Sequence, residues 1–413
     1  MEEELMIDRA QAGEFTAFDR MLRQRVLSQL GALHAGRIVL EDACGTVQIG
    51  QSGAGPVVRV WVTSPEFYPA VAAHGSVGAG EAYMAGHWYS DDLVGLVRML
   101  VRNRDVLDGM ETGWARFGGW ALRGWHWMRR NSQSGSRRNI AAHYDLGNDF
   151  FSLFLSQDQM YSAAYWEGTQ DTLEAASRRK LELVCGRLKL TPEDHLIEIG
   201  SGWGALAVYA AAHYGCRVTT TTISREQYRA ACDRITGAGV ADRVTVLLAD
   251  YRTLTGTYDK LVSIEMIEAV GAQYLDTYFA KIGRLLKPDG LALIQAITIE
   301  DHRYRQALRA VDFIKRHVFP GSFIPSVAAM LAAKTRVSDL ALVEFEDFGI
   351  SYARTLAAWR ERFRSRLAKV RALGFDERFV RMWDFYLAYC EGGFRERSIG
   401  VAHLLFAKPG YRP

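Results

Sequence analysis

Closely spaced glycines after an acidic residue form the clearest candidate binding site in this sequence. A hydrophobic stretch contains Glu198 and runs directly into Gly200, Gly202 and Gly204. Glycines let the backbone turn tightly and approach a ligand, because no Cβ stands in the way. Glu198 can orient this loop or bind an ammonium group. A strand, a glycine loop and a helix in this order predict a site for an adenosine-containing cofactor.

Residues after the next two expected strands indicate which cofactor this is. The strand that ends at Thr222 and Ile223 lacks the acid that commonly binds ribose hydroxyls in dinucleotide sites, which counts against a dehydrogenase. Gln227, on the first helical turn that follows, can supply hydrogen bonds instead. Asp250 and Tyr251 end the following strand, where a carboxylate and an aromatic ring can hold adenine. These positions and the acid in the glycine loop favour S-adenosylmethionine.

A second candidate is the pair of acids Glu265 and Glu268, which stand three residues apart after the expected strand 260–264. Catalytic residues of open α/β sheets lie at the carboxyl ends of strands, as these do. Carboxylates in an otherwise apolar run are costly to bury unless they have a role. The alternatives are a helix N-terminal carboxylate stabilised by the helix dipole for Glu268, and a structural or cofactor-supporting role for Glu265.

Strands alternate with helices from residue 143 onward, and this alternation must position both groups. It predicts a Rossmann-like α/β fold with a mostly parallel, seven-stranded sheet and helices on both faces. A turn at 287–290 is expected to separate a helix from the fifth strand. Helical insertions at 303–334 and 352–391 are expected to build the substrate site. The expected strands are 195–199, 217–222, 244–249, 260–264, 290–296, 341–346 and 402–407.

The first part of the chain has a different pattern. Short strands at 37–40, 47–50 and 57–62, with a helix at 93–101, predict a small α+β domain. The expected division is an N-terminal α+β domain at 1–112, a basic aromatic helix and linker at 113–138, and a domain for S-adenosylmethionine-dependent methyl transfer at 139–413.

The basic aromatic helix combines tryptophans with a cationic stripe. Arg116, Arg123 and Arg130 recur every seven residues and share one helical face, which Trp120 and Trp127 flank. A basic helix with tryptophans can lie in a membrane interface. The alternative is a helix that packs on its own domain and leaves its arginines in water.

The composition excludes several classes of protein. A net charge of +3 over 413 residues does not suggest a nucleic-acid-binding protein. The five cysteines are scattered without metal-ligand spacing, which fits a reducing cytosol and predicts no metal site. The acidic start is no signal peptide, and no apolar run reaches the ~18 residues that span a bilayer. We expect a cytoplasmic protein that meets lipid as a peripheral protein at the inner face of the membrane.

A series of motifs runs along nearly the whole chain. It comprises GEAYMAGHW at 80–88, HYDLGNDFF at 143–151, MYSAAYW at 160–166, EIGSGWG at 198–204, TISREQ at 222–227, EMIEAVG at 265–271, FPG at 319–321 and CEGGF at 390–394. This ordered series resembles the cyclopropane-fatty-acyl-phospholipid synthase family, which includes the mycolic acid cyclopropane synthases. So many motifs in one order make the resemblance highly specific.

The resemblance implies roles for individual residues. It places a bicarbonate ion, which acts as general base in the family, at Glu268, Gln295, Ile297 and Tyr352. Cys390 matches a cysteine proposed as catalytic, although a buried cysteine there is equally well explained as structural. The implied cofactor contacts are Tyr161, Ser162, Gly200, Gly202, Gly204, Thr222, Ile223, Gln227 and Tyr251, with Trp203 inside the same loop.

Some positions depart from the family pattern. Ala163 replaces the cysteine of the usual Tyr-Ser-Cys, so one bicarbonate ligand is missing. Gln295 stands where many bacterial members have histidine, and Ser201 replaces a frequent cysteine without expected harm. The change at Ala163 bears on bicarbonate binding and therefore on the product.

The implied reaction transfers the methyl group of S-adenosylmethionine to the double bond of an unsaturated fatty acyl chain of a membrane phospholipid. Such a transfer leaves a carbocation, and a base then removes a proton. A proton taken from the new methyl group closes a cyclopropane, whereas one taken from the chain leaves a methyl-branched or methylene alkene. Both products stay open, as do a homo-oligomeric state, a soluble substrate for the same fold, and a non-catalytic lipid-binding relative.

Overall fold

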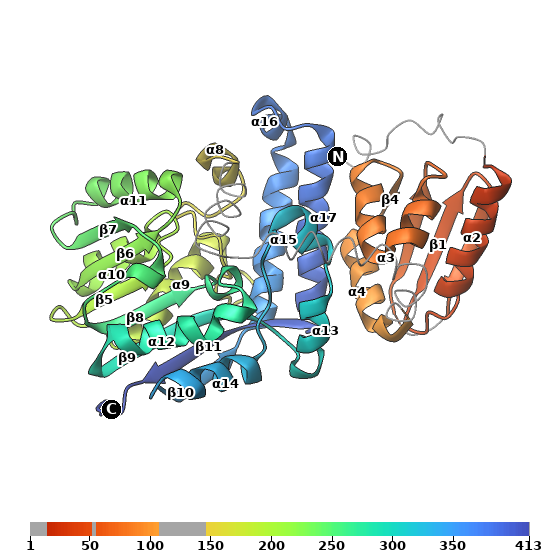
Figure 1. The fold of residues 1–413 in the computed structure, drawn as a ribbon. Coiled ribbons are helices and arrows are strands. Elements are labelled where there is room, and N and C mark those ends of the chain that lie inside the picture. The colour runs from red at the N-terminus through yellow and green to blue at the C-terminus, as the bar shows by residue number, and fades with distance from the viewer. Residues whose placement is uncertain (1–14, 52–54, 107–145, 413) are drawn as a thin grey trace. The chain divides into compact units, whose positions relative to one another are not determined.

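The computed structural model describes residues 15–51, 55–106 and 146–412, which form two compact units (Figure 1). The first unit contains the described residues up to 106 together with 310–318 and 363–396, and the second contains the remainder. The expected domain boundary and the basic aromatic helix at 113–138 lie outside the described residues. Two segments of the C-terminal half belong to the first unit, a feature that a linear division of the chain does not include.

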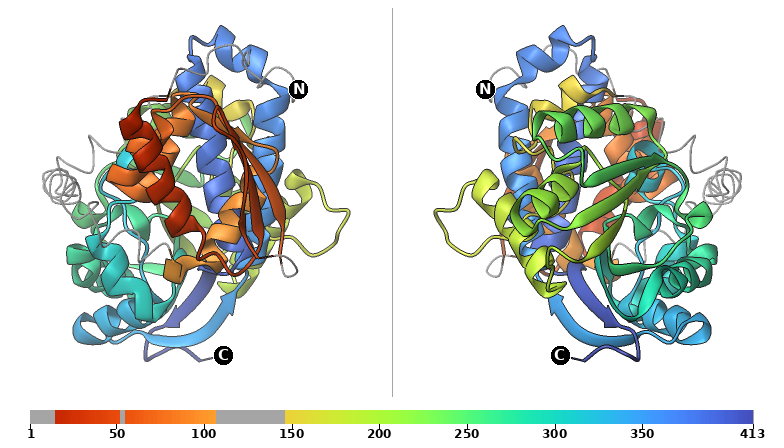
Figure 2. Two further views of the ribbon diagram at one scale, coloured as in Figure 1. Left: turned by 90° about the vertical axis from the view of Figure 1, so that its right-hand side faces the viewer. Right: turned by 90° about the vertical axis from the view of Figure 1, so that its left-hand side faces the viewer.

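The first unit is built on a four-stranded sheet with the order β2-β1-β3-β4, drawn in red to orange in Figure 2. β1 forms an antiparallel hairpin with β2 and pairs in parallel with β3, which pairs antiparallel with β4. The three strands and the helix expected in this region are confirmed. The elements are α2 (Ala17–Leu30), β1 (Arg37–Asp42), β2 (Gly45–Gly50), β3 (Val57–Val62), α3 (Phe67–Met84), β4 (Trp88–Ser90) and α4 (Leu93–Arg102).

Helix α17 (Glu377–Arg395) joins the first unit by packing against α3 and α4. A Cβ on Gly392 would lie 2.5 Å from Cγ1 of Val97, so glycine permits this close approach. The Tyr83 hydroxyl donates a hydrogen bond to Asp384 at 3.0 Å. These contacts explain why part of the C-terminal half folds with the N-terminal sheet. The unit also contains α16 (Leu367–Ala372) and the π-helix η6 (Ile314–Val318).

The second unit has the expected Rossmann-like fold, with a seven-stranded sheet in the order β10-β11-β9-β8-β5-β6-β7. The strands from β7 to β9 pair in parallel, whereas β11 pairs antiparallel with both β9 and β10. The seven expected strands are confirmed. They are β5 (His195–Ile199), β6 (Arg217–Thr222), β7 (Val244–Leu248), β8 (Tyr258–Ile264), β9 (Leu286–Ile299), β10 (Ala341–Asp347) and β11 (Ile399–Ala407).

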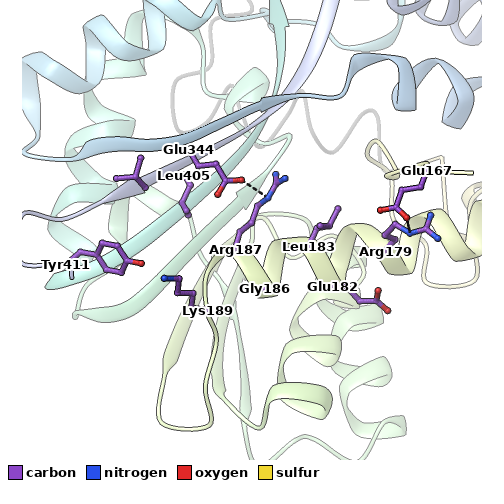
Figure 3. Close-up of a pocket in the computed structure, with 11 residues that line it drawn as sticks. Glu167, Arg179, Glu182, Leu183, Gly186, Arg187, Lys189, Glu344, Leu405 and Tyr411 are labelled. Atoms are coloured by element: carbon purple, nitrogen blue, oxygen red, sulfur yellow. Dashed lines mark ion pairs between the residues drawn. The ribbon is translucent and has the colours of Figure 1, made fainter. Parts of the chain in front are cut away.

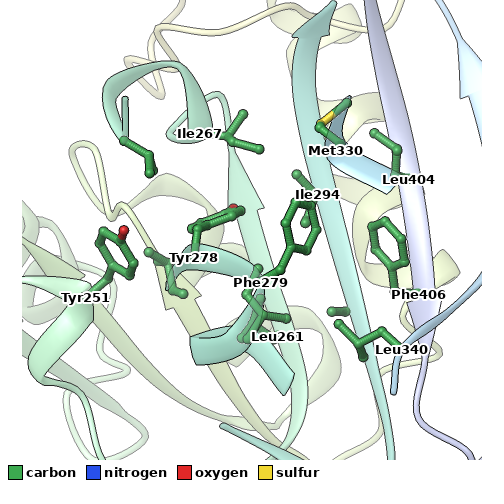
Figure 4. Packing of buried hydrophobic residues seen from close by; sticks show 14 of the residues in the cluster. Tyr251, Leu261, Ile267, Tyr278, Phe279, Ile294, Met330, Leu340, Leu404 and Phe406 are labelled. Carbon is green, nitrogen blue, oxygen red and sulfur yellow. The ribbon is translucent and has the colours of Figure 1, made fainter. Parts of the chain in front are cut away.

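Helices cover both faces of this sheet. Successive side chains of a strand point to opposite faces, and Leu261 and Val262 of β8 accordingly join two different hydrophobic clusters. The cluster of Leu261 includes α12 and α14 (Figure 4), whereas that of Val262 includes α9 and α10. The helices are α8 (Asn148–Ser152), α9 (Leu173–Arg187), α10 (Ala205–Tyr214), α11 (Arg225–Gly237), α12 (Leu275–Leu285), α13 (Tyr304–Arg309), α14 (Val327–Val337) and α15 (Gly349–Ser365).

Strand β9 differs from the expectation at its start. The sequence at 287–290 predicts a turn, yet β9 begins at Leu286 and continues through these residues. Tyr258 of β8 pairs with Leu286, and Lys260 pairs with Leu291, so β9 carries extra residues at this point. Pairing with the neighbouring strand keeps the residues with turn preference in the sheet, where they form a local irregularity.

Truncation of Ile294 tests whether the cluster in Figure 4 stabilises the second unit. Ile294 is fully buried in β9, so Ile294→Ala leaves a cavity and should lower the free energy of unfolding by about 2–5 kcal/mol. Val343→Ala on β10 is the control, because that side chain is 50% exposed and little should change. Urea denaturation compares the two variants, and equal losses would contradict this assignment of the core.

Candidate active site

The glycine loop between β5 and α10 lies where the parallel strands end. Gly200, Gly202 and Gly204 have φ angles of +102°, +49° and +84°, a left-handed backbone that favours glycine. A Cβ on Gly204 would lie 3.1 Å from the Cβ of Ala231, so this glycine lets α10 and α11 pack closely. A Cβ on Gly202 would meet no described atom within 4 Å. The loop therefore has both the conformation and the open space that a bound cofactor needs.

Glu198 lies buried in β5 next to this loop. It accepts a hydrogen bond from the Thr220 hydroxyl of β6 at 2.6 Å. Burial raises the pKa of its carboxyl group to about 8. This hydrogen bond ties Glu198 to the neighbouring strand, and its expected roles, to orient the glycine loop or to bind an ammonium group, stay predictions.

The residues expected at the ends of β6 and β7 are held by their neighbours. Thr222 donates a hydrogen bond to Oε1 of Gln227 at 2.9 Å, which ties the strand end to the first turn of α11. Asp250 forms an ion pair at 2.6 Å with Arg252, a residue that the sequence analysis missed. The Tyr251 hydroxyl is buried without a hydrogen-bond partner among the described residues. The carboxylate of Asp250 is thus already bound to the guanidinium group of Arg252.

Aromatic side chains surround two of the expected cofactor contacts. The Tyr161 ring lies 5.3 Å from the Trp359 ring and 5.2 Å from the Phe151 ring. The indole N–H of Trp203 donates to Asn148 of α8 at 2.7 Å, and the Trp203 ring also lies 5.2 Å from Phe151. Tyr161 and Trp203 therefore belong to one packed aromatic cluster beside the glycine loop.

The carboxylate of Glu265 collects hydrogen bonds from several parts of the second unit. Its Oε1 accepts from the Ala163 backbone N–H at 2.8 Å and from Gln295 Nε2 at 2.7 Å. Its Oε2 accepts from the Tyr352 hydroxyl at 2.9 Å. Burial, the largest effect, raises the pKa of Glu265 above its ordinary value, and these donors and the cation of Lys180 offset part of that rise. The donors favour the ionised form of the carboxyl group.

The backbone of Glu265 is strained. Its φ angle of +47° is left-handed and costs a residue other than glycine about 1–3 kcal/mol. Its N–H donates to the Gln295 carbonyl oxygen at 2.8 Å, which fixes the end of β8 to β9. Strain of this kind persists where the surroundings hold a side chain in place, and it is typical of functional sites.

Glu268 lies in the short helix η3 (Ile267–Ala269) that follows. Its Oε1 accepts a hydrogen bond from the Ile297 backbone N–H at 2.6 Å, whereas its buried Oε2 has no partner among the described residues. Burial, and then the charge of Glu265, raise the pKa of Glu268 to about 8. Burial thus raises the pKa of both acids, and the three donors and the Lys180 cation around Glu265 favour its ionised form more than the single Ile297 N–H favours that of Glu268.

Lys180 of α9 is a buried cation that the sequence analysis missed. Its Nζ donates to the hydroxyl of Ser162, an expected cofactor contact, at 2.6 Å. Burial lowers the pKa of Lys180 to about 8, while Glu265 and Asp158 raise it. A lysine at a core position of the helical repeat was the signal that could have revealed it.

Hydrogen bonds join the expected catalytic residues of the second unit: Gln295 and Tyr352 donate to Glu265, and the backbone N–H of Ile297 donates to Glu268. Cys390 lies in α17 and belongs to the first unit. Burial raises the pKa of the Cys390 thiol. A thiol whose ionisation is disfavoured is a poor nucleophile, so the structural role fits Cys390 better.

A pocket of about 800 Å³ lies between α9, β10 and β11 (Figure 3) and contains none of the expected site residues. Its charged side chains include the ion pairs of Arg187 with Glu344 at 3.0 Å and of Arg179 with Glu167 at 3.1 Å. The two acids and the glycine loop therefore remain the candidate site, and none of them lines this pocket.

Comparisons with known proteins agree with this geometry. The family model of mycolic acid cyclopropane synthetase matches residues 131–404. The chain is 38% identical over 358 residues to the tuberculostearic acid methyltransferase UfaA1 of Mycobacterium tuberculosis, a match that covers 82% of this chain and 81% of that protein. It is 36% identical over 362 residues to the cyclopropane-fatty-acyl-phospholipid synthase of Escherichia coli, covering 87% and 90%.

A solved structure shares the fold. The mycolic acid cyclopropane synthase CmaA1, complexed with SAH and CTAB, aligns with a TM-score of 0.62 and 29% identity over 66% of this chain and 98% of that one. The expected fold, family and cofactor class are confirmed by these matches. The chain belongs to the mycolic acid cyclopropane synthetase family, whose members are S-adenosylmethionine-dependent methyltransferases.

Proposed function

We propose that this enzyme transfers a methyl group from S-adenosylmethionine to the double bond of an unsaturated acyl chain of a membrane phospholipid, with Glu265 as the general base. A methylated alkene is then the main product. One observation carries the proposal: the donors that the family resemblance assigns to bicarbonate bind the enzyme's own carboxylate. The relatives are named for both methyl transfer and cyclopropane synthesis, so their names leave the product open.

The residues present do not fit bicarbonate in the expected way. Gln295 and Tyr352, which should bind it, already donate to Glu265. Ala163 offers no polar side chain, and its backbone N–H donates to the same carboxylate. A carboxylate presents two oxygens to these donors much as bicarbonate would. The base's role therefore falls to Glu265, and no step is derived through bicarbonate.

The glycine loop does fit S-adenosylmethionine, which supplies an electrophilic methyl group when bound. The open space beside Gly202 admits a ligand to the backbone, and Glu198, held by Thr220 at the end of β5, is proposed to orient the loop. Gln227 and Tyr251 are proposed to hold the ribose and adenine from the ends of the neighbouring strands. The unpartnered Tyr251 hydroxyl supports a polar ligand nearby.

The enzyme's own residues are proposed to stabilise the positive charge that forms on the acyl chain and to remove the proton. When the new carbon–carbon bond forms, the adjacent carbon of the acyl chain becomes positive. Ionised Glu265 stabilises this charge, and aromatic faces such as that of Tyr161 can contribute. Glu265 then accepts a proton from the acyl chain, and the electron pair of that C–H bond forms the new double bond. Because Glu265 is fixed by its backbone and three donors, it reaches only certain protons.

The substrate is proposed to lie at the cytoplasmic surface of a membrane. No helix among the described residues is long and apolar enough to cross a bilayer. Helix α2 exposes Phe18 by 60% and Met21 by 54%, one turn apart, and the same helix carries the exposed cations Arg20 and Arg25. Apolar side chains with cations beside them suit an anionic lipid surface, which supports a membrane substrate over a soluble one.

Substitution of Gly202 tests the cofactor site directly. Gly202→Val forces a branched side chain into a left-handed backbone and into the open space beside it, so S-adenosylmethionine binding should be lost. Isothermal titration calorimetry measures the binding without requiring turnover. Gly239→Val is a matched control, because Gly239 has a φ of +70°, has no atom within 4 Å of its Cβ position, and lies before β7 at the opposite edge. Normal binding by Gly202→Val would show that the loop is wrongly assigned.

Exchange of each acid for its amide tests which one is the base. Glu265→Gln should slow turnover by roughly 10²–10⁴-fold, because it removes the proton acceptor. Glu268→Gln should cost less than about tenfold, because burial raises the pKa of Glu268 and so favours its protonated form, whose shape an amide preserves. Transfer of labelled methyl groups to vesicles of an unsaturated phospholipid gives the rates, and mass spectrometry with NMR identifies the lipid product.

A third variant makes the comparison decisive. Glu265→Gly relieves the left-handed strain and opens a space lined by the donors from Ala163, Gln295 and Tyr352. Added formate or bicarbonate should enter it and restore part of the activity. A larger loss from Glu268→Gln would move the base to Glu268. A wild-type enzyme that makes only cyclopropane and needs bicarbonate would overturn the proposal, as would transfer to soluble substrates alone.

A further inference from the structure

A chain of polar side chains leads from Glu265 across two neighbouring strands. Gln295 of β9 is paired directly with His403 of β11, and both side chains are buried. Gln295 Nε2 donates to Glu265, and Gln295 Oε1 lies 2.9 Å from His403 Nε2. On the other side of the imidazole, His403 Nδ1 lies 2.6 Å from Nη1 of Arg187 in α9. The chain thus continues from the carboxylate to a cation.

The chemistry of arginine fixes the direction of every hydrogen bond in this chain. A guanidinium group can only donate, so His403 Nδ1 must accept from Arg187. The single proton of the neutral imidazole is therefore on Nε2, which donates to Gln295 Oε1. The amide of Gln295 then has its oxygen toward His403 and its nitrogen toward Glu265. This orientation follows from the partners and needs no separate assignment of the amide.

Arg187 is itself held in place. Its Nε pairs with Glu344 at 3.0 Å, and its Nη2 pairs with Glu346, both on β10. Glu346 also accepts a hydrogen bond from the Tyr165 hydroxyl at 2.7 Å. Burial lowers the pKa of His403 well below its ordinary value, and the cations of Arg187 and Lys180 lower it further. The imidazole is therefore neutral near neutral pH, as the chain of hydrogen bonds requires.

We propose that His403 is a positioning residue for the general base: together with Arg187, it holds the Gln295 amide so that its N–H, and not its oxygen, meets the Glu265 carboxylate. This inference rests on the proposed role of Glu265. Without His403, the amide can turn over and place its oxygen against the carboxylate oxygen. That contact would repel the negative charge and favour the protonated carboxyl group, which cannot accept a proton.

Loss of the imidazole tests the proposal. In His403→Leu, the acidic limb of the kcat–pH profile should move upward by about one pH unit, as expected for a lost hydrogen bond to a charged group, so kcat should fall roughly tenfold on that limb. The affinity for S-adenosylmethionine, measured by calorimetry, should stay unchanged. His403→Gln keeps a donor for Gln295 and an acceptor for Arg187, and it should restore the profile. The other titratable groups facing Glu265, on Lys180 and Glu268, remain in all variants.

A double-mutant cycle separates positioning from general support of the fold. Gln295→Met removes the amide through which His403 is proposed to act. In that background, His403→Leu should cause no further shift of the profile. An equal shift with and without Gln295 would overturn the proposal, and so would an unchanged profile in a folded His403→Leu variant.

Two further measurements keep the test decisive. If His403→Leu does not fold, Arg187→Met at the partly exposed end of the chain replaces it. This variant frees the imidazole to change tautomer and should shift the acidic limb in the same direction, and an unchanged limb would overturn the inference. Active Glu265→Gln would instead refute the proposed base itself. An inactive Glu265→Gln combined with a normal His403→Leu profile refutes only the positioning role.

Discussion

The buried carboxylate of Glu265 requires hydrogen-bond donors, and three separate parts of the second unit supply them. A charged carboxylate that is withdrawn from water is stable only when donors or cations replace its hydration. Glu265 meets this need with an N–H from the segment before α9, an amide from β9 and a hydroxyl from α15. These groups are far apart in the sequence, so the segment, the strand and the helix must all be in place before the charge is accommodated. The left-handed backbone of Glu265 is the strain that this arrangement supports.

The strand order explains how such distant groups meet. β9 lies between β8 and β11, so Gln295 has the end of β8 on one side and His403 on the other. The parallel strands from β7 to β9 end at one edge, and that edge also collects the glycine loop, Gln227 and Tyr251. One sheet therefore places the proposed cofactor site and the proposed base next to each other, as is general for open α/β sheets.

Two of the departures from the family pattern, at Ala163 and Gln295, are connected through Glu265. Ala163 has no polar side chain, but its backbone N–H bonds to the Glu265 carboxylate. Gln295 provides a second N–H, and its own oxygen is occupied by His403. Considered singly, each of these two residues is a lost or altered ligand of the expected bicarbonate ion. Considered together, they surround an internal carboxylate, and this is why we assign the proton transfer to the protein itself.

The sequence by itself determined the seven strands of the second unit apart from the start of β9, the glycine loop, the family, and the edge at which Glu265 and Glu268 lie. These follow from periodicity, from the backbone freedom of glycine, and from an ordered series of motifs, all of which are local properties. Only the tertiary structure showed that Glu265 accepts the donors expected for bicarbonate, that Lys180 is buried beside Ser162, and that Arg187 and His403 orient Gln295. It also assigned 310–318 and 363–396 to the first unit. These facts depend on burial and on contacts between residues far apart in the chain, and such contacts decide which acid receives the donors and which amide atom faces it.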